Sequence, residues 1–381
     1  MLQKIFRIKD SIDIYISDTE AAEKVLLTFH RMTTRERIEM VAGRQVAEFL
    51  ALLDGKTTVK TLLSRLGTFN PEQAVKLLEY LSSQRLVIDV ADKQTIDSRY
   101  ERQIAFFDDM IPERPGEATQ GILSGKKVVI MGCGAVGSAI AEILARAGVL
   151  HLTLVDCKCI SANHVVRHSF VRSFDIGKRK VDVLSSQLKR INANIGITPI
   201  HAQLRPETDL GRFIHDDANL VINTCDEPYI GHTSLKIGRF AHARNIPIYI
   251  AGGFDAHLMS SGELLYPPYT PCIDCAQNSF NTALKDWKPI YGNVPSGAIG
   301  LIESSKLGDD NKVENHLVGG AGGLAMMNGF SAFMGCMKIL RFLSEDPSFQ
   351  HEAIRYEYLL NSGEMTKFKM NKRKDCHVCD R

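Results

Sequence analysis

The sequence predicts an α/β protein whose larger part is a mainly parallel β-sheet with helices on both faces. The first reason is a regular alternation beyond residue 127. Short apolar runs typical of strands are followed by segments whose apolar residues recur every three to four positions, as a parallel sheet with crossover helices requires. The second reason is a glycine-rich turn between the first such strand and the first such helix. At 381 residues, two or three domains are expected.

Residues 1–90 are expected to form a separate small α+β domain, because strand and helix patterns are mixed there without the regular alternation. The expected elements are, in order, a hairpin at 5–16, helices at 19–30 and 34–53, a short helix from Thr57 or Thr58 to Leu66, a helix from Pro71 with Asn70 as its N-cap, and a strand at 86–88.

Residues 91–126 are polar and contain prolines, which indicates a linker before the larger domain at 127–381. In that domain we expect strands at 127–131, 151–155, 197–201, 219–223 and 246–250, helices at 136–147, 178–192, 229–244 and 316–342, and an antiparallel C-terminal extension at 354–370.

Composition and charge exclude several classes of protein. The chain is 44% hydrophobic and 24% charged with a net charge of +2, which argues against disorder and against a nucleic-acid footprint. The N-terminus lacks the apolar core of a signal peptide. Residues 317–337 are long enough to span a bilayer, but their glycines, Asn328 and Ser331 favour a buried helix at a subunit or domain interface. We therefore expect a cytoplasmic protein that binds neither membrane nor nucleic acid.

The glycine-rich turn spans residues 132–137 (GCGAVG). Gly132, Gly134 and Gly137 let the backbone approach phosphate closely, and the helix N-terminus that follows offers free N–H groups. Asp156, at the end of the next strand, is placed to accept hydrogen bonds from ribose hydroxyls. The pattern predicts a Rossmann-like nucleotide site, and taken alone it favours an NAD-dependent oxidoreductase.

Four of the nine cysteines form two Cys-x-x-Cys pairs, Cys272 with Cys275 and Cys376 with Cys379. Each pair supplies half of a tetrahedral thiolate site, so we expect a zinc ion that holds the C-terminal tail on the domain; a redox pair is the alternative. Four thiolates leave no open position for catalysis, so the zinc would be structural. The remaining cysteines are expected to be buried: Cys133, Cys157, Cys159, Cys225 and Cys336.

Together these features resemble the adenylating superfamily, which includes ubiquitin-activating enzymes, sulfur-carrier adenylyltransferases and peptide-maturation enzymes of the microcin C and pantocin A types. The resemblance covers residues 99–381. It begins at residues 99–103 (RYERQ) and continues through the glycine turn, Asp156, Arg167, residues 177–180 (GKRK), Asp226 and both cysteine pairs.

The resemblance implies that a carboxylate attacks the α-phosphorus of ATP and that pyrophosphate leaves. The protein then has to position the reactants and neutralise phosphate charge. By the same resemblance, Arg102 is an arginine finger supplied by the other subunit of a homodimer. Arg167 and Lys180 contact phosphates or ribose, and Asp226 holds magnesium.

Departures from the family pattern bear on the pocket and on the substrate. Lys158 and His164 stand where members of the superfamily usually carry an acidic residue and an asparagine, which alters the ATP contacts expected of this loop. Residues 276–335 contain no cysteine, so transfer of the activated carboxylate to a thioester is not expected.

Residues 1–90 resemble winged-helix leader-recognition domains, chiefly through residues 49–59 (FLALLDGKTTV). Such a domain offers a strand edge to which an extended leader peptide adds, and residues 5–16 would supply that edge. A DNA-binding winged helix and a dimerisation module are the alternatives. The 14 Lys/Arg against 13 Asp/Glu in residues 1–95 give no basic excess for DNA.

The combined expectation is an ATP- and magnesium-dependent enzyme that activates a carboxylate of a ribosomally made precursor peptide, bound through its leader. As in pantocin A-type maturation, a glutamate side chain would be activated and a ring closed with loss of water. The alternatives are adenylation of a peptide C-terminus as in the microcin C type, adenylation of a sulfur-carrier protein, and a peptide-docking subunit without catalysis.

Overall fold

The structure is a computed structural model that describes residues 1–379 except 22, 68, 91–96, 112, 227–229, 252–258, 284 and 286–323. The chain divides into two compact units. The first comprises Met1–Ile122 with Ser344–Ser348, and the second comprises Leu123–Leu343 with Phe349–Arg381.

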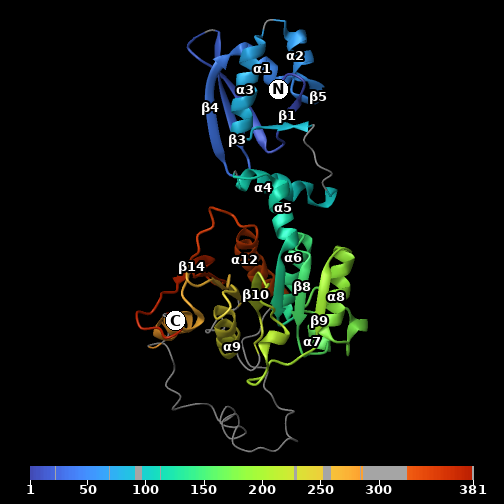
Figure 1. The fold of residues 1–381 in the computed structure, drawn as a ribbon, viewed down its shortest axis with the longest axis vertical. Coiled ribbons are helices and arrows are strands. Elements are labelled where there is room, and N and C mark those ends of the chain that lie inside the picture. Colours follow the sequence, from blue (N-terminus) through green and yellow to red (C-terminus); the bar gives the residue numbers. More distant parts are fainter. Residues whose placement is uncertain are drawn as a thin grey trace, which may run out of the picture. The chain divides into compact units, whose positions relative to one another are not determined.

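The first unit contains two antiparallel three-stranded sheets, and Figure 1 shows them with three helices near the N-terminus. The strand orders are β5-β1-β6 and β2-β3-β4. The strands are β1 (Ile5–Ile8), β2 (Ile12–Asp18), β3 (Lys24–Arg31), β4 (Glu36–Gly43), β5 (Asp54–Thr58) and β6 (Val87–Asp89). The helices are α1 (Arg44–Ala51), α2 (Val59–Leu66) and α3 (Pro71–Ser83).

Three predictions for this region are wrong. The hairpin at 5–16 does not form, because β1 pairs with β5 and β6 whereas β2 pairs with β3. The helix at 19–30 is strand β3, and the helix at 34–53 is strand β4 followed by the shorter helix α1. In β3 the buried residues Val25, Leu27 and Phe29 alternate with more exposed ones, so the period is two rather than 3.6.

Helix caps were predicted correctly in the same region. Thr58 accepts a hydrogen bond from the Thr61 N–H at the start of α2. Asn70 accepts from the Glu72 N–H at the start of α3, with Pro71 in the first turn. These capping signals are local, which is why the sequence alone identifies them.

The segment interpreted as a linker contains two helices, α4 (Glu101–Met110) and α5 (Gly116–Gly125). α4 buries Ile104 and Phe107, and the Gly116 N–H at the start of α5 donates to the Asp108 side chain (2.8 Å). Gly116 leaves no room for a side chain, since a Cβ there would lie 2.1 Å from the Ile104 carbonyl oxygen. The start of α5 therefore lies directly against α4.

The second unit is built on a six-stranded sheet of order β12-β11-β10-β7-β8-β9, with parallel pairing except between β11 and β12. Its strands are β7 (Lys127–Met131), β8 (His151–Val155), β9 (Gly196–Ile200), β10 (Leu220–Asn223), β11 (Ile248–Ile250) and β12 (Glu263–Leu265). The parallel sheet predicted from the sequence is confirmed, and every predicted strand is present within two residues.

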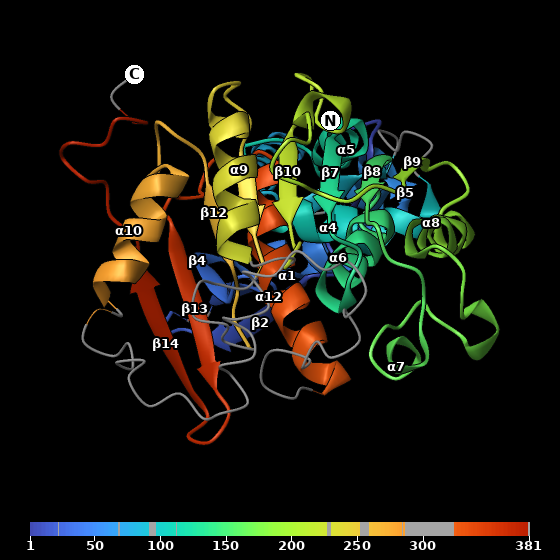
Figure 2. The same cartoon turned by 90° about the horizontal axis from the view of Figure 1, so that it is seen from below.

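Helices cover both faces of this sheet (Figure 2). α9 (Ile230–His242) and α10 (Ile273–Ala283) pack in one core with apolar residues of β7, β10 and β11. α6 (Ala135–Arg146) contacts α8 (Lys180–Ile191) and α12 (Ala325–Leu343). The helix predicted at 316–342 thus begins at Ala325 among the described residues, and its first part lies outside them.

The C-terminal extension is also confirmed. β13 (Ile354–Leu359) and β14 (Glu364–Lys369) pair antiparallel over their full length. Among the described residues, no helix is both long and apolar enough to cross a membrane.

Candidate functional site

The glycine turn joins β7 to α6 with little spare room. Gly132 has φ of +94°, a left-handed conformation that favours glycine, and its N–H donates to the Val155 carbonyl (2.8 Å). A Cβ on Gly137 would lie 2.1 Å from the Gly132 carbonyl oxygen. Gly134 is the N-cap of α6 and offers no side-chain cap. The first N–H groups of α6 therefore have no side-chain acceptor at the N-cap, as an anion site requires.

Alanine at Gly137 and alanine at Gly134, on either side of the start of α6, should affect stability and ATP binding differently. Gly137→Ala is expected to lower the free energy of unfolding by about 1–3 kcal/mol, because the methyl group meets backbone. Gly134→Ala is the matched control for folding, since nothing lies within 4 Å of its Cβ position. Gly134→Ala should keep the thermal midpoint of unfolding. ATP binding, measured by calorimetry, should become weaker, because the methyl group would occupy the space that phosphate approaches. Equal midpoints for the two variants would contradict this account.

Asp156 fixes the glycine turn from the end of β8. Its carboxylate accepts the Cys133 N–H and the Lys158 N–H, each at 2.7 Å. These bonds hold the turn against the loop after β8, and they orient the carboxylate at the carboxyl edge of the sheet. The predicted contact of Asp156 with ribose hydroxyls remains a prediction.

Lys180 and Asp226 interact electrostatically beside this turn. Lys180 begins α8 and is only 4% exposed, and burial lowers the pKa of its amine while Asp156 and Asp226 raise it. Asp226 is exposed and lies three residues beyond β10. A buried cation and an exposed carboxylate thus lie close to the helix N-terminus, which is the charge pattern that a triphosphate with a divalent cation needs.

Two residues that the sequence analysis missed hold this arrangement. Thr224 donates its hydroxyl to the Gly132 carbonyl (2.7 Å), which ties the end of β10 to the glycine turn. Asn223, fully buried, donates to the hydroxyls of Thr233 (3.1 Å) and Ser234 (2.9 Å) on α9. Polar residues that end an otherwise apolar strand were the signal that could have identified them.

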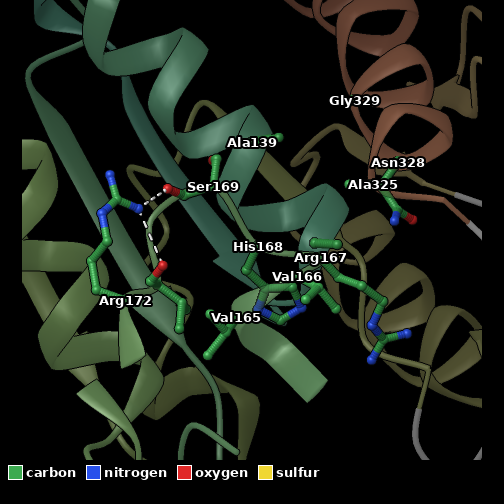
Figure 3. Close-up of a pocket in the computed structure, with 12 residues that line it drawn as sticks. Ala139, Val165, Val166, Arg167, His168, Ser169, Arg172, Ala325, Asn328 and Gly329 are labelled. Carbon is green, nitrogen blue, oxygen red and sulfur yellow. Dashed lines mark hydrogen bonds between the residues drawn. The ribbon is translucent and has the colours of Figure 1, made fainter. Parts of the chain in front are cut away.

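A cavity of about 240 Å³ lies beside the start of α6, and Arg167 lines it with an exposed side chain (Figure 3). Its walls come from three parts of the second unit: Ala135 and Ala139 of α6, residues 165–169 with Val171 and Arg172, and Ala325, Asn328 and Gly329 of α12. Arg167 therefore belongs to a hollow next to the phosphate turn, as a nucleotide contact would.

Two stacked histidines lie in this region, and one of them, His168, lines the cavity. The rings of His164 and His168 lie 4.7 Å apart between centroids. Burial, with the charges of Lys180 and Arg167, lowers the pKa of His164 to about 4 and that of His168 to about 3. Both rings are therefore neutral near pH 7. His164 accepts the Ser161 N–H through Nδ1 (2.9 Å), so this departure from the family pattern completes the cap of the short helix α7 (Ala162–Val165).

The candidate residues divide between the two units. Gly132, Gly134, Gly137, Asp156, Arg167, Lys180 and Asp226 all belong to the second unit. Arg102 belongs to the first unit, where it lies in the first turn of α4 with an exposed side chain.

The two cysteine pairs meet, although 104 residues separate their partners. One ligand atom from each of Cys272, Cys275, Cys376 and Cys379 lies within 4.8 Å of the others. The Sγ atoms of Cys272 and Cys376 are 3.6 Å apart, and those of Cys275 and Cys379 are 3.7 Å apart. Four sulfurs at about 2.3 Å from zinc form a tetrahedron with edges of about 3.8 Å, so the cluster fits a zinc site.

Surrounding groups support this interpretation. Burial raises the pKa of Cys272 and brings that of Cys275 to about 11, whereas, against the effect of burial, the backbone N–H groups of Cys379 and Val378, with neighbouring thiols, lower the pKa of Cys376 to about 7. The Arg373 N–H points at the Cys275 sulfur (3.3 Å), and His242 Nε2 lies 2.9 Å from the Val378 carbonyl oxygen. Thiolates stabilised by N–H groups are the usual ligands of a structural zinc ion.

The prediction that all five other cysteines are buried is wrong for three of them. Cys133 and Cys336 are buried, but Cys157 and Cys225 are intermediate and Cys159 is exposed. Cys159 lies in the loop after β8, where its backbone forms an isolated antiparallel β-bridge with Arg179, and its side chain does not pack into the core.

Comparison with known proteins places these features in a family. The chain matches the ThiF family over residues 100–378. It is 30% identical over 164 residues to the molybdopterin-synthase adenylyltransferase of Escherichia coli, covering 42% of this chain and 62% of that relative. It is 26% identical over 226 residues to the enzyme of the same name from Salmonella typhimurium, covering 58% and 86%. For the adenylyltransferase and sulfurtransferase uba4 of Aspergillus fumigatus, the match is 28% over 247 residues and spans 43% of that protein.

Solved structures resemble the chain over nearly its whole length. MccB of Escherichia coli with ATP superposes with a TM-score of 0.68 at 17% identity, over 98% of this chain and 99% of that chain. The microcin C7 biosynthetic enzyme MccB in complex with N-formylated MccA gives the same TM-score, identity and coverage. PaaA gives a TM-score of 0.68 at 17% identity over 95% and 99%. At this identity the likeness shows the shared fold.

Proposed function

This chain belongs to the ThiF family of adenylating proteins, and we propose that it uses ATP and Mg²⁺ to activate a carboxylate of a ribosomally made precursor peptide. The observation that carries the proposal is the meeting of the glycine turn, buried Lys180 and exposed Asp226 at the carboxyl edge of the sheet. Parallel α/β sheets bind their ligands at this edge.

In the proposed reaction a carboxylate oxygen bonds to the α-phosphorus, the α–β phosphoanhydride bond breaks, and pyrophosphate leaves with the electron pair. The N–H groups at the start of α6 bind phosphate oxygens, and Lys180 neutralises their charge. Arg167 binds phosphate or ribose from the adjoining cavity, and Asp156 orients the ribose. Asp226 would hold a magnesium ion, which would neutralise charge on the leaving pyrophosphate.

Arg102 completes this proposal as an arginine finger. Its side chain is exposed in the first turn of α4, so it is available to a second copy of the chain. We propose a homodimer in which Arg102 contributes to the site of the partner subunit. The four-cysteine cluster holds structural Zn²⁺ that fixes the C-terminal tail.

After activation, we propose that a nearby backbone nitrogen attacks the acyl carbon of a glutamate side chain, AMP leaves, and the ring closes with net loss of water. Cys133 and Cys336 give little support to a thioester route, because both are buried and burial raises the pKa of Cys336 to about 12. Adenylation of a peptide C-terminus is the second candidate, favoured by the likeness to MccB.

We assign peptide recognition to the small domain, residues 1–90. β1 is the middle strand of its sheet, so the edge expected from residues 5–16 is supplied by β2 alone. β2 is an edge strand of β2-β3-β4, and Tyr15 and Ile16 on it are 56% and 57% exposed. An unpaired edge with exposed apolar side chains suits β-addition of an extended leader.

Exchange of labelled pyrophosphate into ATP tests both the proposed activation with ATP and the proposed peptide substrate. We expect exchange with a leader-bearing precursor peptide, and none with a small carrier protein ending in Gly-Gly. Ile16→Ala should raise the KM for the peptide by about tenfold with kcat unchanged, since edge contacts serve binding only. Val41→Ala is the matched control, because Val41 is 59% exposed on the opposite edge strand β4. Exchange with the carrier protein alone would refute the peptide assignment.

A further inference from the structure

The last turn of helix α4 carries two carboxylates, Asp108 and Asp109, whose negative charge is unfavourable at the C-terminus of a helix. The C-terminus of a helix carries partial negative charge and favours cations. No basic residue lies in the last turn of α4. Groups from elsewhere in the first unit must therefore neutralise this pair.

Asp109 is held by three elements of the small domain. Its side chain is completely buried, and Arg31 at the end of β3 donates to Oδ1 (3.3 Å). Thr33, in the turn after β3, donates to Oδ2 (2.7 Å). Lys9, in the turn between β1 and β2, places Nζ 3.5 Å from Oδ1. Arg31 also donates to the Gln84 carbonyl (2.9 Å), so the network reaches the end of α3.

Asp108 extends the network to the start of α5. Lys9 Nζ lies 3.2 Å from its Oδ2, and Arg85 Nη1 lies 3.8 Å from its Oδ1. The same oxygen accepts the Gly116 N–H. Arg85 further donates to the Arg114 carbonyl (2.8 Å). The chain on both sides of the α4–α5 turn is thus bonded to the small domain.

These contacts bury charge near one end of the short helix α4, which Figure 1 shows, while Glu101 and Arg102 at its other end are exposed. Buried charges that lose a partner are strongly destabilised, so the network resists sliding or rotation of α4. Arg102 and Asp109 lie seven residues apart, which is two turns or about 10 Å along the helix axis. Because a helix of this length is rigid, contacts that fix the end at Asp109 also fix the position of Arg102 at the other end.

We propose that the small domain and α4 form one rigid body in which Asp109 is the positioning residue for Arg102. This inference rests on the proposed function of Arg102 as an arginine finger. The domain assigned to peptide recognition then has a second role, because it sets the position of a group that acts on the nucleotide. Residues far from the ATP site in sequence, Lys9, Arg31 and Thr33, become determinants of the rate of adenylation.

A double-mutant cycle tests the positioning role. Asp109→Asn keeps the shape of the side chain and removes its charge, and it should lower kcat for pyrophosphate exchange by about tenfold or more with the peptide KM unchanged. In an Arg102→Ala background, the same substitution should change the residual rate by less than about twofold, because the group that it positions is absent. Asp89→Asn is the matched control, because it removes a carboxylate of the same unit that pairs with Lys4 at 2.6 Å.

A milder variant covers the case in which Asp109→Asn does not fold. Thr33→Val removes a single hydrogen bond to Asp109 and keeps every charge, so it should show the same dependence on Arg102 at smaller amplitude. Losses that add in the double variant would overturn the positioning role and leave the proposed function intact. An Arg102→Ala variant with undiminished exchange would overturn the arginine-finger assignment and, with it, this inference.

Discussion

Asp226→Asn is expected to lower magnesium-dependent pyrophosphate exchange by about 10²–10³-fold. The substitution keeps the size of the side chain and removes the charge that we assign to magnesium at the end of β10. It also removes a charge that raises the pKa of Lys180, so the buried lysine loses part of its support as a cation. Steady-state exchange at saturating peptide, with magnesium titrated, measures the effect.

Asp217→Asn is the control for this experiment. Asp217 is an exposed carboxylate of the same unit that pairs with Lys127, and its loss should leave exchange unchanged. Peptide binding should survive Asp226→Asn, because the proposed leader site lies in the small domain. Mixing Asp226→Asn with Arg102→Ala protein should restore some activity if the finger acts on the partner's site. Full exchange by Asp226→Asn alone would contradict the assignment of the magnesium ligand.

Cys376→Ser should release the zinc ion and cause the largest loss of stability. Structural zinc contributes on the order of 10 kcal/mol in small zinc-binding peptides, and here the four thiols join segments far apart in sequence. We expect zinc content by elemental analysis to fall from one ion per chain to none. The thermal midpoint should drop, and the C-terminal residues after β14 should become sensitive to protease.

Cys159→Ser is the matched control, because Cys159 is an exposed thiol outside the cluster. It should retain zinc and the thermal midpoint of the parent chain. Treatment of the parent chain with a zinc chelator should reproduce the effects of Cys376→Ser. Retention of one zinc ion per chain by Cys376→Ser would show that the cluster is not the metal site.

The larger unit could be predicted closely from the sequence because its signals are local. Apolar runs of β7 and β10 are continuous, as buried parallel strands require, and the helices of this unit keep a clear period. The glycine turn and the caps Thr58 and Asn70 also depend on a few adjacent residues. The spacing of the cysteines predicted their meeting, since two such pairs have few other uses.

The small domain was predicted less well because its strands depend on distant partners. The segments that form β3 and β4 contain residues compatible with a helix, and pairing across β2, β3 and β4 decides their conformation. Likewise, β1 pairs with β5 and β6 rather than with its neighbour β2, so the free edge belongs to β2. The spacing of apolar residues within one segment does not predict which distant strand that segment pairs with.

The sequence by itself therefore determined the parallel sheet, the glycine turn after β7 and the two cysteine pairs that meet in this protein. Only the tertiary structure decided how the site is supported. It showed that Thr224 and Asn223 tie the end of β10 to the glycine turn and to α9, that Lys180 is buried, and that Asp109 in the helix of Arg102 is bonded to Arg31 and Thr33. The physical reason is that burial and charge pairing join residues distant in the chain, and they are properties of the packed protein rather than of any short segment.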